Sequence, residues 1–263
     1  MARLPLPFSQ TMKRLILICL LTLALPRPGF ASNDSIAALV AKGDALDQQF
    51  KTQESLSAYL VAEKLGGNDA DLLRKIAREY ALAMPDAKAK AEKLALGQKS
   101  VSYAQRAVAT DPKNALAHLA LAICYGRVAP LLGNRTKIAY SKLIKEHAEQ
   151  SIALDATNDY AFHVLGAWHY EMADLNPVLR TFAKLIYGAL PAASYEDAVK
   201  NFKMAISLAP QRVAHRVEIG RTYAALGEKE MARTELNKGL ALPSREKDDA
   251  ESKQRARDAL EKI

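Results

Sequence analysis

The sequence has few of the residues that build disulfides, metal centres or nucleophilic sites. Its 263 residues include two cysteines and five histidines, and only 6% are aromatic. Cys19 lies in an apolar N-terminal stretch, which leaves Cys124 without a partner for an internal disulfide. Cys124 lies in the apolar segment LALAICYG, so we expect it to be a small buried hydrophobe and not a nucleophile.

Motifs of catalysis are also missing. No CxxC pair occurs, and His163 and His169 are six residues apart, not the four of a helical zinc site. The segment GNRTK at Gly133 lacks the second glycine of a phosphate-binding loop. Serine, histidine and aspartate residues are too scattered to name a triad. We therefore expect no enzyme activity, no metal and no cofactor.

The chain also lacks a basic stripe of the kind that binds nucleic acid. The formal net charge is +8, but residues 1–31 carry four basic and no acidic residues. The remainder has 33 basic and 29 acidic residues, a net charge of +4. No run of lysine and arginine with interleaved aromatic residues occurs, so nucleic acid is not an expected partner.

No apolar run is long enough to span a bilayer. The longest, Leu15–Leu25, has 11 residues, whereas a spanning helix needs about 20. Lys13 and Arg14 precede this run, and the small-x-small triplet GFA ends just before Ser32. This order is typical of an export signal, so residues 1–31 are predicted to be a signal peptide and the protein to be periplasmic.

Two alternatives concern the N-terminus. Pro26 and Pro28 crowd the cleavage region, and an uncleaved signal would leave the protein anchored to the membrane. Translation could start at Met1 or at Met12, and the second start gives a more typical signal length.

The remaining sequence repeats one pattern. A small residue is followed by a proline five positions later at Ala107–Pro112 and at Ala205–Pro210. Upstream, a small residue precedes a tyrosine or histidine by three positions, in four copies: Ala77 and Tyr80, Ala122 and Tyr125, Gly166 and His169, Gly220 and Tyr223. Four copies in phase indicate repeated pairs of helices, because one repeat cannot bury its apolar face alone.

This pattern resembles the tetratricopeptide repeat. The small residue allows the two helices of a pair to approach closely, and the proline stops the second helix. We predict an all-α solenoid of about five hairpins with an inserted helix and a C-terminal capping helix. The predicted repeats are 36–69, 70–113, 114–157, 158–211 and 212–244, with a cap at 247–263, all in one domain over 32–263.

Three insertions lengthen the inner turns of consecutive hairpins. Met84–Gly97 is expected to lengthen helices, and Arg127–Tyr140 breaks at Pro130 before a long basic helix. The third insertion begins with Pro177 at the first position of a helix, after Asn176. Apolar residues recur on one face of this inserted helix, 177–190: Val178, Leu179, Phe182, Leu185 and Ile186. This face either packs on the solenoid or contacts lipid.

A narrower resemblance covers about residues 114–243. The segments KEHAEQSIALD, HVLGAWHYE and ALPAASYEDAV, together with the insertion before the last of these, are similar to the regulator of microtubule dynamics family. That resemblance implies a helical scaffold. In animals it also implies association with microtubules and, for one branch, lipid exchange at organelle contacts. The export signal is a departure from the family and makes microtubules a doubtful partner here.

The tetratricopeptide resemblance also implies which residues face the concave groove. These are Arg74, Arg78, Leu119, Ile123, His163, Tyr170, Glu171 and Arg221. Basic ends around an apolar middle suit an extended peptide with acidic groups, or an anionic amphiphile. We therefore expect a non-catalytic scaffold that binds a protein or peptide in this groove. The alternatives are lipid binding through the inserted helix and a membrane-anchored structural repeat.

Overall fold

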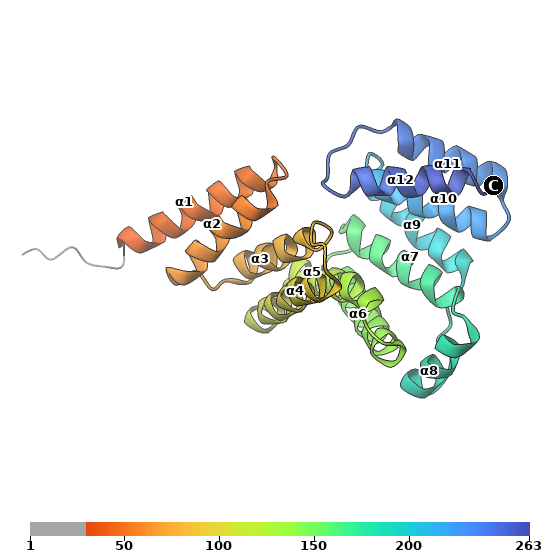
Figure 1. The fold of residues 1–263 in the computed structure, drawn as a ribbon, viewed down its shortest axis with the longest axis horizontal. Coiled ribbons are helices and arrows are strands. Elements are labelled where there is room, and N and C mark those ends of the chain that lie inside the picture. Colours follow the sequence, from red (N-terminus) through yellow and green to blue (C-terminus); the bar gives the residue numbers. More distant parts are fainter. Residues whose placement is uncertain (1–29) are drawn as a thin grey trace, which may run out of the picture.

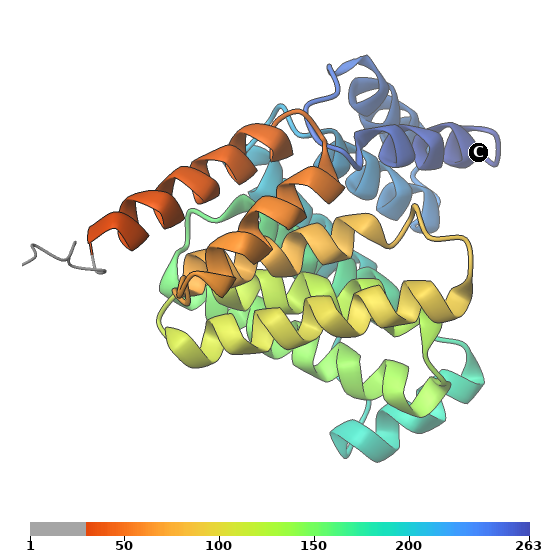
Figure 2. The ribbon, with the colours of Figure 1, turned by 60° about the vertical axis from the view of Figure 1, so that its left-hand side comes forward.

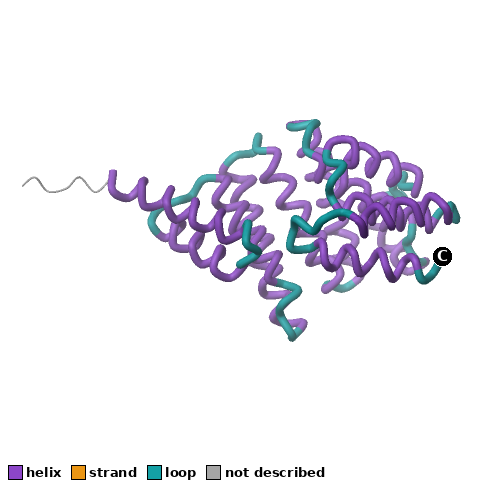
Figure 3. Tube along the Cα trace, turned by 90° about the horizontal axis from the view of Figure 1, so that it is seen from above, coloured by secondary structure: helices purple, strands orange, loops and turns teal. Residues whose placement is uncertain are grey.

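The computed structural model describes the backbone of residues 30–263 and the side chains from Ser35 onward. Helices and loops make up this part of the chain, which contains no strand (Figure 3). The predicted all-α class is therefore confirmed. No helix in the described residues has both the length and the apolar character needed to cross a membrane. The predicted signal peptide lies outside the described residues, apart from Phe30 and Ala31.

The helices form five consecutive hairpins (Figures 1 and 2). The pairs are α1 (Phe30–Asp47) with α2 (Thr52–Lys64), α3 (Ala70–Ala83) with α4 (Lys90–Thr110), α5 (Ala115–Val128) with α6 (Asn134–Leu154), α7 (Asp159–Ala173) with α9 (Tyr195–Leu208), and α10 (Val213–Ala225) with α11 (Lys229–Ala241). A last helix, α12 (Asp249–Leu260), packs on α10 and α11 and covers the end of the stack.

Polar side chains start the first helices of several hairpins. The side chains of Asp69, Asn114 and Asn158 each accept a hydrogen bond from a backbone N–H in the first turn of the helix that follows. Such caps contribute about 1 kcal/mol each, because they satisfy N–H groups that have no partner inside the helix. The turns between repeats are therefore encoded locally.

The small residues of the repeat lie where the two helices of a hairpin touch. A Cβ atom added to Gly166 would lie 2.9 Å from the ring of Phe202, and one added to Gly220 would lie 2.7 Å from Cγ of Leu236. Ala77 and Ala122, at the same position of their repeats, are completely buried. The close approach of the helices therefore depends on a small side chain at this position.

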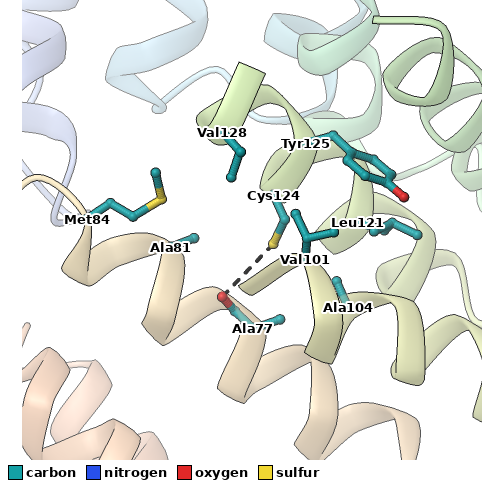
Figure 4. Close-up of a cluster of buried hydrophobic side chains, with 9 residues drawn as sticks. All are labelled: Ala77, Ala81, Met84, Val101, Ala104, Leu121, Cys124, Tyr125 and Val128. Atoms are coloured by element: carbon teal, nitrogen blue, oxygen red, sulfur yellow. Dashed lines mark hydrogen bonds between the residues drawn. The ribbon is translucent and has the colours of Figure 1, made fainter. Parts of the chain in front are cut away.

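One buried cluster joins the second and third hairpins. Ala77 and Ala81 of α3, Val101 of α4 and Leu121 and Cys124 of α5 contact one another there (Figure 4). The thiol of Cys124 faces the carbonyl oxygen of Ala77 at 4.0 Å, and burial raises the pKa of this thiol to about 11. Cys124 is therefore a buried hydrophobe, as expected.

The first two insertions take different forms. In the first, Met84–Ala89 forms a turn and only α4 is lengthened, because Pro85 has no N–H with which to continue α3. The expectation that this insertion simply lengthens helices is therefore only partly right. In the second, a short 3₁₀ helix, η2 (Ala129–Leu131), precedes the long α6.

The third insertion forms α8 (Pro177–Tyr187), which packs on α6 (Figure 1). Asn176 caps the helix through the N–H of Leu179, and Gly188, with a φ of 81°, ends it. Phe182 packs with Ile138 and Trp168 in a cluster that α6, α7 and α8 share.

Successive first helices contact one another along one side of the stack. α3 contacts α5, α5 contacts α7, and α7 contacts α10. We call the side formed by α3, α5, α7 and α10 the inner face. Closer packing of first helices on this side is what curves a stack of hairpins into a solenoid.

Candidate functional site

The two arginines predicted at the start of the groove are already paired within the chain. Arg74 lies 2.7 Å from Asp71. The guanidinium group of Arg78 lies 2.5 Å from the carboxylate of Asp47 and 3.0 Å from that of Glu79. The inner face therefore does not present these arginines as unpaired positive charges.

Glu79 is an unusual buried acid beneath this cluster. Its side chain is 1% exposed, and its Oε2 atom has no hydrogen-bond partner among the described residues. Burial raises the pKa of Glu79 to about 7, although the positive charge of Arg78 opposes this shift. A buried carboxyl in such surroundings gains or loses its charge near neutral pH.

The middle of the predicted groove is less open than expected. Leu119 is buried and Ile123 is half-buried in α5. His163 lies against His215, with 3.0 Å between their Nδ1 atoms, and Nε2 of His215 lies 2.8 Å from the carboxylate of Asp159. His163 therefore belongs to a packed polar chain between α7 and α10.

The histidines and aspartates look scattered in the sequence, and the structure brings Asp159, His163 and His215 together. Burial lowers the pKa of His163 well below its ordinary value. Burial also lowers the pKa of His215, although the carboxylate of Asp159 opposes this shift. No group of three or more histidine, cysteine or acidic side chains in the described residues is arranged to hold a metal ion. Asp159 and His163 are four residues apart on α7, so helical spacing places them on one face, but only the tertiary structure brings His215 of α10 to them.

Tyr170 and Arg221, predicted at the far end of the groove, do lie together. The guanidinium carbon of Arg221 is 5.2 Å from the ring centre of Tyr170, and its Nη1 atom lies 2.6 Å from Glu218. They line a cavity of about 300 Å³ between α7, α10 and α12, whose other lining residues include Arg255 and Lys262. Glu171 beside it is exposed.

The inserted helix divides its apolar residues between two environments. Leu179, Phe182 and Ile186 pack against the cluster that α6 and α7 build. Val178 and Leu185 are 56% and 71% exposed. The five residues therefore do not share one buried face.

The most extensive contacts across the inner face come from a segment that sequence reasoning did not single out. Residues 243–248, which we call the strap, connect α11 to α12 (Figure 1). Lys247 donates from Nζ to Thr52 Oγ1 at 3.0 Å, to the carbonyl oxygen of Leu82 at 2.9 Å and to Asp86 at 2.9 Å. The strap thus joins the end of the solenoid to its first two hairpins, and Figure 2 shows it beside the turn between α1 and α2.

The acids on either side of Lys247 contact the other three hairpins. Glu246 pairs with Arg212 at the start of α10 and accepts a hydrogen bond of 2.5 Å from the hydroxyl of Tyr160 in α7. Asp248 pairs with Arg127 at the end of α5. The only signal in the sequence was the dense charge of REKDD, which alone does not indicate what these side chains contact.

Known proteins share both the sequence pattern and the fold. The family model for "Regulator of microtubule dynamics protein 1-3" matches residues 39–263. Regulator of microtubule dynamics protein 1 is 30% identical over 206 residues in Bos taurus and 29% identical over 216 in Mus musculus. These alignments cover 77% and 81% of this chain, but 65% and 70% of the relatives. The chain thus spans about two thirds of the length of these relatives.

A solved structure shows the same fold. A thermophilic TPR protein of Thermus thermophilus superposes with a TM-score of 0.62 over 86% of this chain and 98% of its own. The sequence identity is 15%, so this likeness concerns the fold alone. Because the family match extends from the first hairpin to the last residue, the chain belongs to the regulator of microtubule dynamics protein 1-3 family and has its tetratricopeptide-like fold.

Proposed function

We propose that the protein is a non-catalytic scaffold that binds an extended segment of a protein partner along its inner face. The tetratricopeptide-like fold and the family both favour a role in protein interaction over an enzymatic one. The observation that carries the proposal is the strap. A connecting segment already lies across this face, and the three consecutive charged side chains of its turn, Glu246, Lys247 and Asp248, are all paired.

The charges of the inner face favour a partner of mixed charge. Arg78 and Arg221 are both paired with acids of this chain, so a purely acidic peptide would have to displace Asp47 or Glu218. Asp86 and the carbonyl oxygen of Leu82 offer acceptors for a cation in the same region. A segment that carries both acids and a lysine matches these groups better than the acidic peptide expected from the sequence.

The names of the relatives connect those proteins with microtubule dynamics. We propose that residues 1–31 direct export of this chain, and export would separate it from cytoplasmic filaments. We therefore base the proposed partner on the chemistry of the inner face.

Photo-crosslinking tests the proposed function. A photoreactive amino acid replaces Glu171, which is exposed on α7, or Met204, which is 46% exposed on α9, and each variant is expressed in the native cell. We expect a discrete crosslinked protein at position 171 and none, or much less, at position 204. Equal crosslinking at the two positions would contradict binding at the inner face.

A second candidate function is contact of α8 with lipid. Val178 and Leu185 expose apolar side chains on a helix that also carries Arg180 and Lys184, a combination typical of helices that lie in a membrane surface. Sedimentation with vesicles that contain anionic lipid tests this function. The variant Leu185→Asp should abolish co-sedimentation, and unchanged sedimentation would exclude this surface.

A further inference from the structure

We propose that the strap is an internal ligand of the inner face, and that a partner segment with a lysine between two acidic residues displaces it. This inference rests on the proposed function and names both the chemistry of the partner and the step that controls access. The strap supplies the pattern itself, in Glu246, Lys247 and Asp248.

The acceptors of Lys247 form a site for one ammonium group. Thr52 lies at the start of α2, Leu82 in the last turn of α3, and Asp86 in the turn that follows. The carbonyl groups of a last helical turn have no partner within the helix, and this end of the helix dipole favours a cation. An ammonium group has three donors, and each finds one acceptor here. The first two hairpins thus provide a complete lysine site.

The acids on either side of Lys247 add two ion pairs to the lysine site. Asp248 pairs with Arg127 of the third hairpin and Glu246 pairs with Arg212 at the start of α10, so both pairs lie on the C-terminal side of the lysine site along the solenoid. Three consecutive side chains therefore contact all five hairpins. A ligand that spans a repeat protein has this form, because each repeat supplies one part of an extended surface.

The shape of the strap is set from within. The carboxylate of Asp249 accepts hydrogen bonds from the N–H groups of Arg245 and Glu246, at 2.7 and 2.9 Å. Arg245 is exposed, whereas the three charged residues that follow it contact other hairpins. The strap is thereby held ready to dock.

The contacts of the strap are also suited to exchange. The side chains of Lys247, Glu246 and Asp248 are 21%, 29% and 35% exposed, and ion pairs open to water are weak individually. A tethered segment nevertheless competes at an effective concentration of about millimolar or more. A partner with the same pattern must therefore bind by further contacts along the inner face.

The test supplies the strap as a separate peptide. The probe is a synthetic peptide of residues 242–250, LPSREKDDA, and the control peptide has alanine in place of the lysine. The strap of the full chain is opened by the changes Glu246→Gly, Lys247→Ser and Asp248→Gly. A second variant, Asp86→Lys, keeps the sequence of the strap but places a positive charge beside Lys247. Asp86 is 61% exposed, so this change is compatible with folding.

Binding is followed by NMR titration to millimolar peptide at low salt, with circular dichroism as the check of folding. We expect the strap-open variant to bind the probe at least tenfold more tightly than the unmodified protein does, and to bind the control peptide at least tenfold more weakly than the probe. In the Asp86→Lys variant the strap should be released, seen as changed side-chain NMR signals of Arg127 and Arg212, which its two acids contact, and the probe should not bind.

Two results would overturn the inference: no binding of the probe to the folded strap-open variant, or equal binding to that variant and to the unmodified protein. Crosslinking at Glu171 separates this failure from failure of the proposed function. If the partner still crosslinks there while the probe does not bind, the inner face is the site and the strap is only a structural connection.

Discussion

The ammonium group of Lys247 lies 2.9 Å from the carboxylate of Asp86, although 161 residues separate them in the chain. This contact joins the connector before the last helix to the turn between α3 and α4. The solenoid therefore curves far enough for the connector near its C-terminal end to reach its N-terminal hairpins, and this connector crosses the inner face. The stability of the two ends is therefore coupled.

Loss of this contact should be measurable as a loss of stability. The variant Lys247→Gln removes a charged donor with three acceptors, and we expect the free energy of unfolding to fall by about 1–3 kcal/mol. The matched control is Lys238→Gln, because Lys238 pairs with Glu235 at a site that is 52% exposed and should contribute little. Denaturant unfolding measures both variants. If Lys247→Gln lowers the free energy of unfolding no more than Lys238→Gln does, the contacts of Lys247 do not stabilise the fold.

The small residue of the fourth hairpin should not tolerate a large side chain. In Gly166→Leu, even the first carbon of the new side chain would lie within 2.9 Å of Phe202, so we expect a loss of about 1–3 kcal/mol or more from overpacking. Gly133→Ala is the control, since nothing lies within 4 Å of the added Cβ atom. A Gly166→Leu variant that melts at the temperature of the unmodified protein would show that α7 and α9 are spaced differently.

Glu79 should make stability depend on pH near neutrality. Its pKa is about 7 in the folded protein and 4.5 ordinarily, so the folded state holds the proton more tightly. Its contribution to stability is therefore fully present below about pH 4.5 and is lost as the pH rises through about 7. Glu79→Gln should be more stable than the unmodified protein at pH 8 and about equal to it at pH 4.

The control for this pH dependence is Glu230→Gln, because Glu230 is 88% exposed. Thermal unfolding between pH 4 and 8 measures all three proteins. If Glu79→Gln keeps the same slope of stability with pH as the unmodified protein, the buried carboxyl is not the titrating group.

Two changes in α8 should separate its packed and its exposed residues. Phe182 is half-buried against the cluster with Ile138 and Trp168, so Phe182→Asp places a charge at its edge and we expect a loss of about 1–3 kcal/mol. Leu185→Asp should change stability by less than about 0.5 kcal/mol, since Leu185 is 71% exposed. Circular dichroism during heating tests both, and a large effect of Leu185→Asp would mean that another surface covers it.

The proposed export signal has a direct test. Intact-mass measurement of protein recovered from the periplasm should show a chain that begins at Ser32. Recovery of the uncleaved chain in the membrane fraction would support the anchored alternative.

Much of the fold could be read from the sequence because its determinants are local. The helices of a hairpin approach closely at Gly166 and Gly220, where only a small residue fits. The side chains of Asn114 and Asn158 cap helices by accepting hydrogen bonds from N–H groups three positions away. These features recur with each hairpin, so the number of hairpins, their order and the inserted helix follow from the sequence alone. Asn176 and Pro177 mark the start of α8 in the same way.

Only the tertiary structure decided what the inner face presents. The sequence placed Arg78 and Arg221 in the groove, but their pairing with Asp47 and Glu218 depends on rotamers and on neighbouring helices. The strap is the clearest case, because its contact with Asp86 requires the summed curvature of all five hairpins. Each hairpin adds a small rotation that depends on its own packing, and no single residue encodes the total. The repeated pattern therefore allows the fold of this chain to be predicted from its sequence, whereas the docking of the strap on the inner face depends on the whole solenoid.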